Sequence, residues 1–498
     1  MCGLRIALIT PEFHSLVRRT NLAGVSESLA KALLGTRQEV AVFLPHTLDV
    51  DTSVLGSLTE RTEVKVKDGP GWQRFQVSEG RFGELPVFLF ENDSLFGRRH
   101  PYGDHEGPYP DNWKRYALFS LAVLSSFEPL AFVPEVLHCM DWTTGLIPLY
   151  HQRLYAEGQP DHPLAQAGTY FAIHNLAMQG VFEREILPHI GIPHRYFRNI
   201  EGVELGGKVN FLKAGAEFGT IVGTHSPGHA LKIQERDRGY GLEETFQRRK
   251  KELIGISNGI DYQAWNPQND PALPAAFGPH DKDFAGKRRC KAVLQAQLKL
   301  DNGPRTPIAC TIGRWDADGG FDLVAEVLTE ILERNVELVV MGQGSPEMTQ
   351  RLMTWEGAFV GRMRVIDGYD PQTAHLMMGG ADILLLPSHY QPANPLFAIG
   401  MRYGVVPLVY ARSGLEDAVA NFTNDKRAGA GFHFQPYTAD GLMEGLNQCL
   451  SAYKDPEKWR LLVRRCLAQD LSWEATAEEY LKAYRRVTRR SKQRSGVE

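Results

Sequence analysis

Three segments in the first half of the chain carry side chains suited to binding a charged or hydroxylated ligand. A basic pair, Arg18-Arg19, stands just before a helical pattern, where it could hold a phosphate. Strand-like runs lead into two further segments, His138–Trp142 and His174–Gly180, and a His-Asn pair at a strand end can hydrogen-bond sugar hydroxyls. Taken alone, the basic pair is more typical of a solvated surface, and each histidine could equally be a satisfied core residue.

Two segments in the second half add candidates of the same kind. Arg314 follows a strand and could point a guanidinium into a ligand site, although a solvated arginine is an equal alternative. The loop Pro387–Pro395 leads into a helix whose N-terminus would favour an anion, although a plain strand-to-helix turn is the favoured interpretation of that string alone. The sequence has no P-loop, no G-x-G-x-x-G fingerprint, no Ser-His-Asp order and no cluster of metal ligands.

In the second half of the chain, the strands and helices that must position Arg314 and the loop Pro387–Pro395 alternate regularly. Short apolar strands are separated by helical patterns of about 10–15 residues, which indicates right-handed βαβ units and a parallel sheet with helices on both faces. The expected strands are Ile308–Ile312, Glu337–Met341, Met363–Ile366, Asp382–Pro387 and Val406–Tyr410, with helices over Phe321–Glu333 and after Pro346, Asp370, Pro395 and Ser413. The stretch Pro267–Lys287, rich in Pro, Asp and Gly, is expected to be a surface excursion.

The first half repeats this alternation less regularly. Its expected elements are the strands Leu4–Ile9, Glu39–Leu44, Val87–Phe90, Glu135–His138, Gly168–His174 and Gly219–Val222, the helix Leu22–Leu34 and a hairpin over Thr62–Val77. Turn formers at Gly255–Asp261 place a boundary there. We therefore expect an α/β protein with two Rossmann-like, doubly wound domains, residues 1–255 and 256–472, that face a central ligand-binding cleft. Residues 473–498 are expected to form a C-terminal helix that crosses back to the first domain and ends in a basic tail.

Composition and charge narrow the class of protein further. The chain has 498 residues, 43% of them hydrophobic and 23% charged, and its formal net charge of −4 provides no overall field that attracts nucleic acid. No apolar run approaches the roughly 20 residues of a membrane span, and no signal peptide pattern opens the chain. Six scattered cysteines without ligand spacing favour a reducing cytoplasm and no structural zinc. A solvated helix end is the favoured interpretation of the basic tail, ahead of a patch for an anionic polymer.

Several long strings, found in order along the chain, are specific enough to identify a family. The strings are Ile173–Phe182, Gly207–Gly215, Gly239–Glu243, Ser257–Pro267, Gly400–Pro407 and Gln469–Trp473. Through them the chain resembles bacterial glycogen synthases and plant starch synthases over nearly its whole length, from Ile6 to about Tyr484. These are retaining, two-domain glucosyltransferases of the GT-B type that use ADP-glucose. The resemblance therefore implies a GT-B fold.

The resemblance also implies roles for individual residues. Asp141 and Trp142 match the family's aspartate-tryptophan pair, and His174 matches the histidine that contacts the transferred glucose. Arg314 matches the arginine that holds the donor diphosphate, and Tyr369 stands where the family places an aromatic ring against the nucleobase. No metal or other cofactor is implied. The full set so implied is His174, Asp141 and Gln391 for catalysis, Arg18, Arg314, Gly319, Tyr369, Asn394 and Pro395 for the donor, and Tyr102 and Asn175 for the glucan acceptor.

The departures from the family cluster at the donor positions. The family's Lys-X-Gly-Gly-Leu is Arg18–Leu22 here, and the lysine that follows the arginine by five residues is Gly319. The family's Glu-Pro-Cys-Gly-Leu is Gln391–Pro395, which replaces a carboxylate near the reacting sugar and removes an N–H from a helix start. Removing one preorganised donor group typically costs about 10²–10³ in rate. We therefore expect impaired transfer, and expect combined reversions that include Gly319→Lys to restore part of it.

The resulting prediction is a glycogen/starch-synthase-like glucosyltransferase of α-1,4-glucan metabolism, located in the cytoplasm. It would transfer glucose from ADP-glucose to the non-reducing end of a glucan, with impaired activity. Two alternatives remain open: a non-catalytic relative that binds glucan or regulates an active synthase, and a transferase that uses a different nucleotide sugar. The expected partners are glycogen or maltooligosaccharide and a nucleotide sugar, with no nucleic acid and no membrane.

Overall fold

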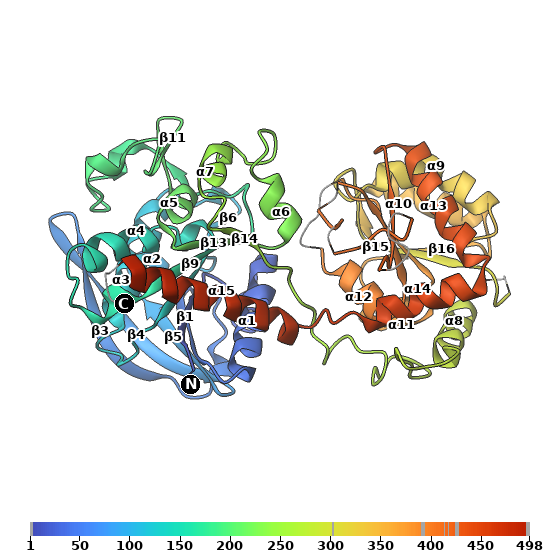
Figure 1. Ribbon diagram of the computed structural model, residues 1–498, viewed down its shortest axis with the longest axis horizontal. Helices are drawn as coiled ribbons and strands as arrows, with labels where there is room; N and C mark the ends of the chain where they lie inside the picture. The colour runs from blue at the N-terminus through green and yellow to red at the C-terminus, as the bar shows by residue number, and fades with distance from the viewer. Residues whose placement is uncertain are drawn as a thin grey trace. The chain divides into compact units, whose positions relative to one another are not determined.

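The computed structural model describes residues 3–300, 303–389, 394–412, 414–416, 418–423 and 428–494. The chain divides into two compact units (Figure 1). Unit 1 consists of Met1–Ile256 together with Trp473–Glu498, and unit 2 of Ser257–Ser472. The chain therefore passes from one unit to the other twice. Among the described residues, no helix is both long enough and apolar enough to cross a membrane.

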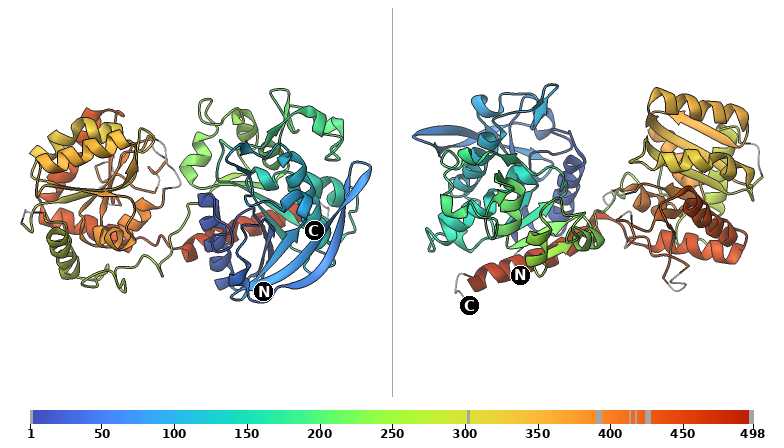
Figure 2. Two further views of the ribbon diagram at one scale, coloured as in Figure 1. Left: turned by 180° about the vertical axis from the view of Figure 1, so that it is seen from behind. Right: turned by 90° about the horizontal axis from the view of Figure 1, so that it is seen from above.

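Unit 1 is built on a large sheet with the strand order β14-β13-β9-β8-β1-β2-β5-β4-β3. Neighbouring strands are parallel from β14 to β5, and β3 and β4 form an antiparallel hairpin at the edge, which confirms the hairpin expected over Thr62–Val77 (Figure 2). The strands are β1 (Arg5–Ile9), β2 (Glu39–Pro45), β3 (Thr59–Asp68), β4 (Gly71–Phe82), β5 (Leu85–Glu91), β8 (Val136–Met140), β9 (Gly168–Ile173), β13 (Ile221–Thr224) and β14 (Leu253–Gly255).

Helices cover both faces of this sheet. On one face α1 (Asn21–Gly35) lies beside the last helix, α15 (Trp473–Arg494), whose apolar side packs into the same core (Figure 1). There the Tyr484 hydroxyl lies 2.6 Å from Nδ1 of the buried His138. The other face carries α3 (Asn112–Ser126), α4 (Ile147–His151) and α5 (Phe211–Phe218). Smaller elements are α2 (Asp93–Phe96), α6 (Pro227–Lys232), α7 (Glu243–Arg248), the pair β6 (Gly103–Asp104) and β7 (Gly107–Pro108), and the small sheet of β10 (Val181–Phe182), β11 (Glu204–Leu205) and β12 (Lys208–Asn210).

Unit 2 has a parallel sheet with the strand order β17-β16-β15-β18-β19-β20. The alternation of strands and helices expected from the sequence is confirmed in this unit. The strands are β15 (Ile308–Trp315), β16 (Glu337–Gly344), β17 (Met363–Asp367), β18 (Ile383–Leu386), β19 (Val406–Tyr410) and β20 (Phe432–Phe434). The helices are α8 (Ala285–Gln297), α9 (Phe321–Glu333), α10 (Pro346–Ala358), α11 (Pro371–Gly380), α12 (Leu396–Arg402), α13 (Ala439–Tyr453) and α14 (Pro456–Ala468).

Three sequence-based expectations for unit 2 are wrong. β15 continues past Ile312 to Trp315, because the buried Trp315 indole anchors the end of the strand and its backbone pairs with β16. Position 413 itself lies outside the described residues, but no helix follows it in the described part of the segment up to β20. The Pro267–Lys287 stretch is not purely a surface excursion, since Phe277 and Phe284 are buried in the core of unit 2.

Candidate active site

Three neighbouring strands of unit 1 end in side chains that can take part in chemistry. β8 pairs in parallel with β1 on one side and with β9 on the other, so the segments that follow them leave the sheet at the same edge. Asp141 directly follows β8, His174 directly follows β9, and Glu12 follows β1 after a short turn. The fold thereby brings two carboxylates and an imidazole to one edge of the sheet.

Asp141 holds the segment after β9 in place. Its Oδ1 accepts the backbone N–H groups of His174, at 2.7 Å, and Asn175, at 3.2 Å. Its own backbone has a positive φ of 55°, a strained conformation for a residue with a side chain. Burial raises the pKa of Asp141, whereas the nearby His174 and the two N–H groups lower it. A buried carboxylate that fixes the backbone of its neighbour suits a positioning role.

His174 presents a buried ring nitrogen toward this edge. Its Nε2 has no hydrogen-bond partner among the described residues. Burial lowers the pKa of His174, although the nearby Asp141 carboxylate opposes this shift. Near pH 7 the ring is therefore neutral and can donate or accept one hydrogen bond, which suits a sugar hydroxyl. Asn175 is exposed, and its Oδ1 accepts the N–H of Ala177 at 3.1 Å, so its side chain also orders the loop.

Tyr102 lies beside Trp142 at the same edge. Their ring centroids are 6.4 Å apart, and the Trp142 ring leaves no room for a side chain at position 180, where a Cβ would come within 2.3 Å of it. The Tyr102 hydroxyl donates to Oε1 of Glu12 at 2.6 Å. Burial and the Glu12 carboxylate raise the pKa of Tyr102 well above its usual value, so the phenol stays protonated. The structure thus brings Tyr102, Asp141, Trp142, His174 and Asn175 to one edge of unit 1.

Sequence reasoning missed Glu12, which organises the first loop. Its side chain is fully buried, and its carboxylate accepts the Arg19 N–H, the Thr20 N–H at 2.7 Å and the Thr20 hydroxyl at 2.8 Å. Thr20 in turn caps α1 by accepting the N–H of Leu22 at 3.2 Å. A carboxylate three residues after the end of the first strand was the signal available in the sequence. The backbone donors that precede α1 are therefore already taken by a carboxylate of the protein itself.

The basic pair of this loop is divided between two roles. Arg19 forms an ion pair with Asp49, which also lies 2.7 Å from Nδ1 of His100. Arg18 is exposed and forms no hydrogen bond or ion pair with any described residue. Asp49 therefore holds one member of the basic pair, Arg19. Arg18 alone is available to an anion.

Two more histidines, at the end of β13, were missed by sequence reasoning. The rings of His225 and His229 stack with their centroids 4.0 Å apart, and both side chains are buried. Burial lowers the pKa of His225 well below its usual value and that of His229 to about 3, with repulsion from His174 adding to each shift. Nδ1 of His225 has no partner among the described residues. Both rings are therefore neutral near pH 7.

In unit 2, Arg314 lies at the end of β15 with two carboxylates beside it. Its guanidinium nitrogens lie 3.3 Å from Oδ2 of Asp316 and 3.4 Å from Oδ2 of Asp318. The side chain is largely exposed, so water screens these pairs, yet the local charge is no longer positive. The sequence predicted the arginine as an anion ligand but missed its two acidic neighbours, although both stand within four residues of it.

Gly319 lies in a turn that has no room for a larger residue. A Cβ at this position would lie 2.3 Å from the carbonyl oxygen of Arg314. Its N–H donates to Oδ1 of Asp316 at 2.8 Å, and its carbonyl accepts the Ser388 hydroxyl at 3.3 Å. The expectation that Gly319→Lys would simply restore a cation is therefore wrong. The backbone of residues 314–319 must rearrange before any side chain fits.

The helix start expected to bind phosphate is capped by the protein. Oδ1 of Asn394 accepts the N–H of Leu396, the first residue of α12, at 3.0 Å. Pro395 stands at the cap and has no N–H of its own. Gln391 lies outside the described residues. Tyr369 is 59% exposed and follows Gly368, whose N–H donates to the Gly342 carbonyl at 2.6 Å. No group of ligands suited to a metal ion occurs among the described residues.

Comparison with known proteins identifies the family. A starch synthase catalytic domain model matches residues 5–248, and a model of glycosyl transferases group 1 matches residues 296–461. A glycogen synthase of Anaeromyxobacter sp. (strain Fw109-5) is 35% identical over 485 residues, which covers 97% of this chain and 99% of that protein. The chain belongs to the glycogen synthase family. Glycogen synthase 2 of Geobacter sulfurreducens is 32% identical over 482 residues, or 97% of this chain and 98% of that protein.

Solved structures agree with this glycogen-synthase-type assignment. The catalytic domain of starch synthase IV from Arabidopsis thaliana, bound to ADP and acarbose, is 28% identical, with a TM-score of 0.81 and coverage of 98% of this chain and 100% of that one. A glycosyltransferase from Rickettsia africae is 12% identical, with a TM-score of 0.58 and coverage of 97% of this chain and 98% of that one. At this low identity the match supports the fold alone. The protein is a GT-B glycosyltransferase with two Rossmann-like domains, as the sequence predicted.

Proposed function

We propose that this glycogen-synthase-type protein binds α-1,4-glucan and transfers glucose to it from ADP-glucose at a rate far below that of an ordinary synthase. One observation carries the proposal: apart from Arg18, the donor-side groups that would receive the diphosphate already have partners within the protein. Glu12 takes the N–H groups before α1, Asp316 and Asp318 flank Arg314, and Asn394 takes the first N–H of α12.

The energetic consequence follows from how such transferases work. The leaving group is a diphosphate, so the rate depends on positive groups and N–H donors that are already in place when the bond breaks. One such donor is worth about 10²–10³ in rate. Every internal partner must first be displaced, and the losses act on one transition state, so they do not add independently. Low turnover is therefore expected even though the fold is intact.

The glucan side supports retained binding. Tyr102, Trp142, His174 and Asn175 lie together at one edge of unit 1, with an unpartnered imidazole nitrogen and an exposed amide. In the proposed reaction His174 and Asp141 orient the transferred glucose, and Tyr102 and Asn175 contact the acceptor. Arg18, Arg314 and the start of α12 would hold the diphosphate, and Tyr369 would lie against the nucleobase. We propose no resident cofactor.

A second candidate function is supported by the same contrast between the glucan-side residues and the donor-side groups. A protein whose glucan-side residues are in place while its donor groups are engaged internally could bind glucan, or regulate an active synthase, without catalysis. We propose the cytoplasm as the compartment of either activity, which is supported by the five described cysteines, all of them unpaired.

Calorimetric titration with ADP, ADP-glucose, UDP-glucose and maltoheptaose, run side by side, tests the proposal. The expected result is binding of maltoheptaose and weaker binding of ADP and ADP-glucose. Glucan binding without any nucleotide binding would favour the non-catalytic relative. Preferred binding of UDP-glucose would favour a different donor, and absence of maltoheptaose binding would contradict both candidates.

A further inference from the structure

Two buried imidazole nitrogens at the strand ends of unit 1 have no hydrogen-bond partner among the described residues. They are Nε2 of His174 and Nδ1 of His225. The proposed function uses His174 but gives His225 no role. A buried polar atom without a partner costs stability, so its partner is usually a bound water or a ligand. Two such atoms beside a candidate active site point to a polar ligand.

The sheet of unit 1 places these two histidines side by side. β9 and β13 are neighbouring parallel strands, and Thr224, the last residue of β13, is paired with Ile173, the last residue of β9. His225 and His174 are therefore the next residues of the two strands. Asp141 follows β8 on the other side of β9. His225 thus lies next to the histidine that orients the sugar in the proposed function.

The ring of His225 is held in place by its neighbours. It stacks on the ring of His229, with the centroids 4.0 Å apart and an angle of 28° between the planes. His229 is itself fixed, because Nδ1 of its ring forms a hydrogen bond with the Thr224 hydroxyl. The backbone N–H of His229 also donates to the Ser226 hydroxyl oxygen at 3.0 Å. A ligand that reaches His225 therefore meets a nitrogen that is already in position.

The charge state of His225 favours a hydroxyl group as its partner. Burial lowers the pKa of His225 well below its usual value, and the nearby His229 and His174 add to this shift, so the ring is neutral near pH 7. A neutral imidazole donates one hydrogen bond and accepts another, and a hydroxyl can do both. A neutral ring brings no positive charge to a phosphate. The position therefore suits a sugar better than the diphosphate of the donor.

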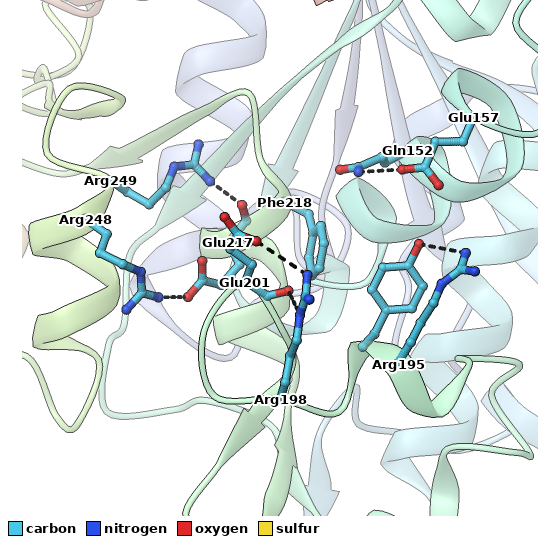
Figure 3. Close-up of a pocket in the computed structure, with 10 residues that line it drawn as sticks. Gln152, Glu157, Arg195, Arg198, Glu201, Glu217, Phe218, Arg248 and Arg249 are labelled. Atoms are coloured by element: carbon cyan, nitrogen blue, oxygen red, sulfur yellow. Dashed lines mark hydrogen bonds and ion pairs between the residues drawn. The ribbon is translucent and has the colours of Figure 1, made fainter.

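The charged side chains around one cavity of unit 1 contrast with His225. This cavity, of about 760 Å³, lies near the amino ends of β13 and β14 (Figure 3). Three arginines of its lining are each paired with a glutamate: Arg198 with Glu201 at 3.4 Å, Arg248 with Glu217, and Arg249 with Glu252 at 3.5 Å. These guanidinium groups are satisfied within the protein, whereas Nδ1 of His225 is not.

We propose that His225 binds a hydroxyl group of the transferred glucose, beside His174. This inference rests on the proposed transfer reaction and adds a second imidazole to its sugar site. His225 would then help to select the sugar, because a sugar that lacks this hydroxyl would leave the buried nitrogen without a partner.

Calorimetric titration of the full chain with ADP-glucose and with ADP tests the inference, because the ratio of the two affinities isolates the part of the sugar. His225→Phe keeps a ring against His229 and removes both ring nitrogens. It should weaken the binding of ADP-glucose by about three- to tenfold, the usual worth of one neutral hydrogen bond, and leave the binding of ADP unchanged. His225→Asn, whose amide can take the place of Nδ1, should recover most of the lost affinity.

His151→Phe is the matched control. His151 is buried like His225, but its Nε2 lies 2.7 Å from the carbonyl oxygen of Leu164. This variant should melt at a lower temperature without a change in the affinity ratio. His225→Phe should melt no lower than the wild type, because it removes a buried nitrogen that has no partner. A lower melting temperature of His225→Phe with an unchanged affinity ratio would show a structural role and overturn the inference.

Two further comparisons separate this inference from the proposed function. With the ADP-glucose analogue that lacks the contacted hydroxyl, the wild type and His225→Phe should bind equally, and the same loss with every monodeoxy analogue would overturn the inference. If His174→Phe weakens the binding of ADP-glucose and His225→Phe does not, the proposed function stands and the inference fails. Absence of ADP-glucose binding to the wild type would contradict both.

Discussion

Arg314 illustrates how the neighbours of a residue bear on the role that its resemblance to a family implies. In the proposed function the guanidinium holds the donor diphosphate, but Asp316 and Asp318 lie within 3.4 Å of it. A phosphate approaching this group must compete with two carboxylates. Sequence similarity predicts the arginine, and the altered charge becomes plain only when the geometry shows both aspartates turned toward it.

Asp316→Asn/Asp318→Asn should tighten ADP binding by about two- to fivefold, because it removes two competing carboxylates whose exposed ion pairs are each worth little. The dissociation constant from calorimetry measures the effect. Glu326→Gln is the control, since it removes one charge from the exposed side of α9 without a contact to Arg314. Equal ADP affinity of the double variant and the wild type would show that the aspartates do not compete with phosphate.

Glu12 supports the first loop more than any other side chain. Glu12→Gln should lower the free energy of unfolding by about 2–3 kcal/mol, because an amide cannot accept all the donors that now converge on the buried carboxylate. Tyr102→Phe, which removes one of these hydrogen bonds, should cost about 1 kcal/mol. Urea unfolding measures both values. Glu60→Gln, at an exposed position of β3, is the control, and an equal effect of both glutamate substitutions would contradict the role of Glu12.

Residue-scale prediction succeeds where one strand end determines the position of a side chain. Asp141 and His174 directly follow buried strands, so the parallel sheet alone brings them together. It fails for Glu12, because the partners of that carboxylate come from a loop and from Tyr102, which is 90 residues away in the chain. It fails also for Gly319, whose tight turn depends on the backbone of Arg314.

At the scale of elements, the start of α12 is stabilised by the Asn394 cap, which would compete with the diphosphate in the proposed donor site. Asn394→Ala should lower the free energy of unfolding of unit 2 by about 1 kcal/mol, the usual cost of a lost cap. The same change frees the Leu396 N–H and should tighten ADP binding. Denaturant unfolding and calorimetry measure the two opposed effects.

A second cap provides the comparison for this prediction. Asp455 caps α14 by accepting the N–H groups of Glu457 and Lys458, both at 3.2 Å. Asp455→Ala should cost similar stability without any gain in ADP affinity. If Asn394→Ala loses stability and ADP affinity together, the cap does not compete with phosphate, and this part of the account fails.

The sequence predicts most of the elements correctly because the period of apolar residues distinguishes strands from helices. The expected strand Leu4–Ile9 and helix Leu22–Leu34 appear as β1 and α1 with nearly the same bounds. The helix expected after position 413 fails because local composition carried that expectation alone, and tertiary pairing there instead adds β20 to the sheet. β15 is longer than expected because its last residues are held by pairing with β16.

At the scale of the whole molecule, buried histidines should make unit 1 the acid-sensitive part. Burial lowers the pKa values of His46, His138, His151, His174, His225 and His229 in unit 1, and in unit 2 it lowers that of His433. When the pH falls below about 6.5, the unfolded chain takes up protons that the folded unit does not. Stability is therefore lost as the pH falls from about 6.5 toward the lowered values.

His229, whose pKa is lowered to about 3, allows this effect to be measured. At about pH 5 it alone should reduce the free energy of unfolding by about 2 kcal/mol relative to neutral pH. His229→Gln should remove that part of the pH dependence, whereas His105→Gln, at an exposed position, should not. Urea unfolding at both pH values provides the numbers, and hydrogen exchange should show unit 1 opening first. Equal pH dependence in the two variants would contradict the prediction.

Transfer of labelled glucose from ADP-glucose to glycogen tests the central claim most directly. The glycogen synthase of Anaeromyxobacter serves as the active reference. The wild type should be slower than this reference by about a hundredfold or more. A combined variant, Asp316→Asn, Asp318→Asn, Gln391→Glu and Pro395→Leu, should recover at least about tenfold, because its changes act on one transition state. A wild-type rate equal to that of the reference would contradict the claim that internal partners occupy the donor site.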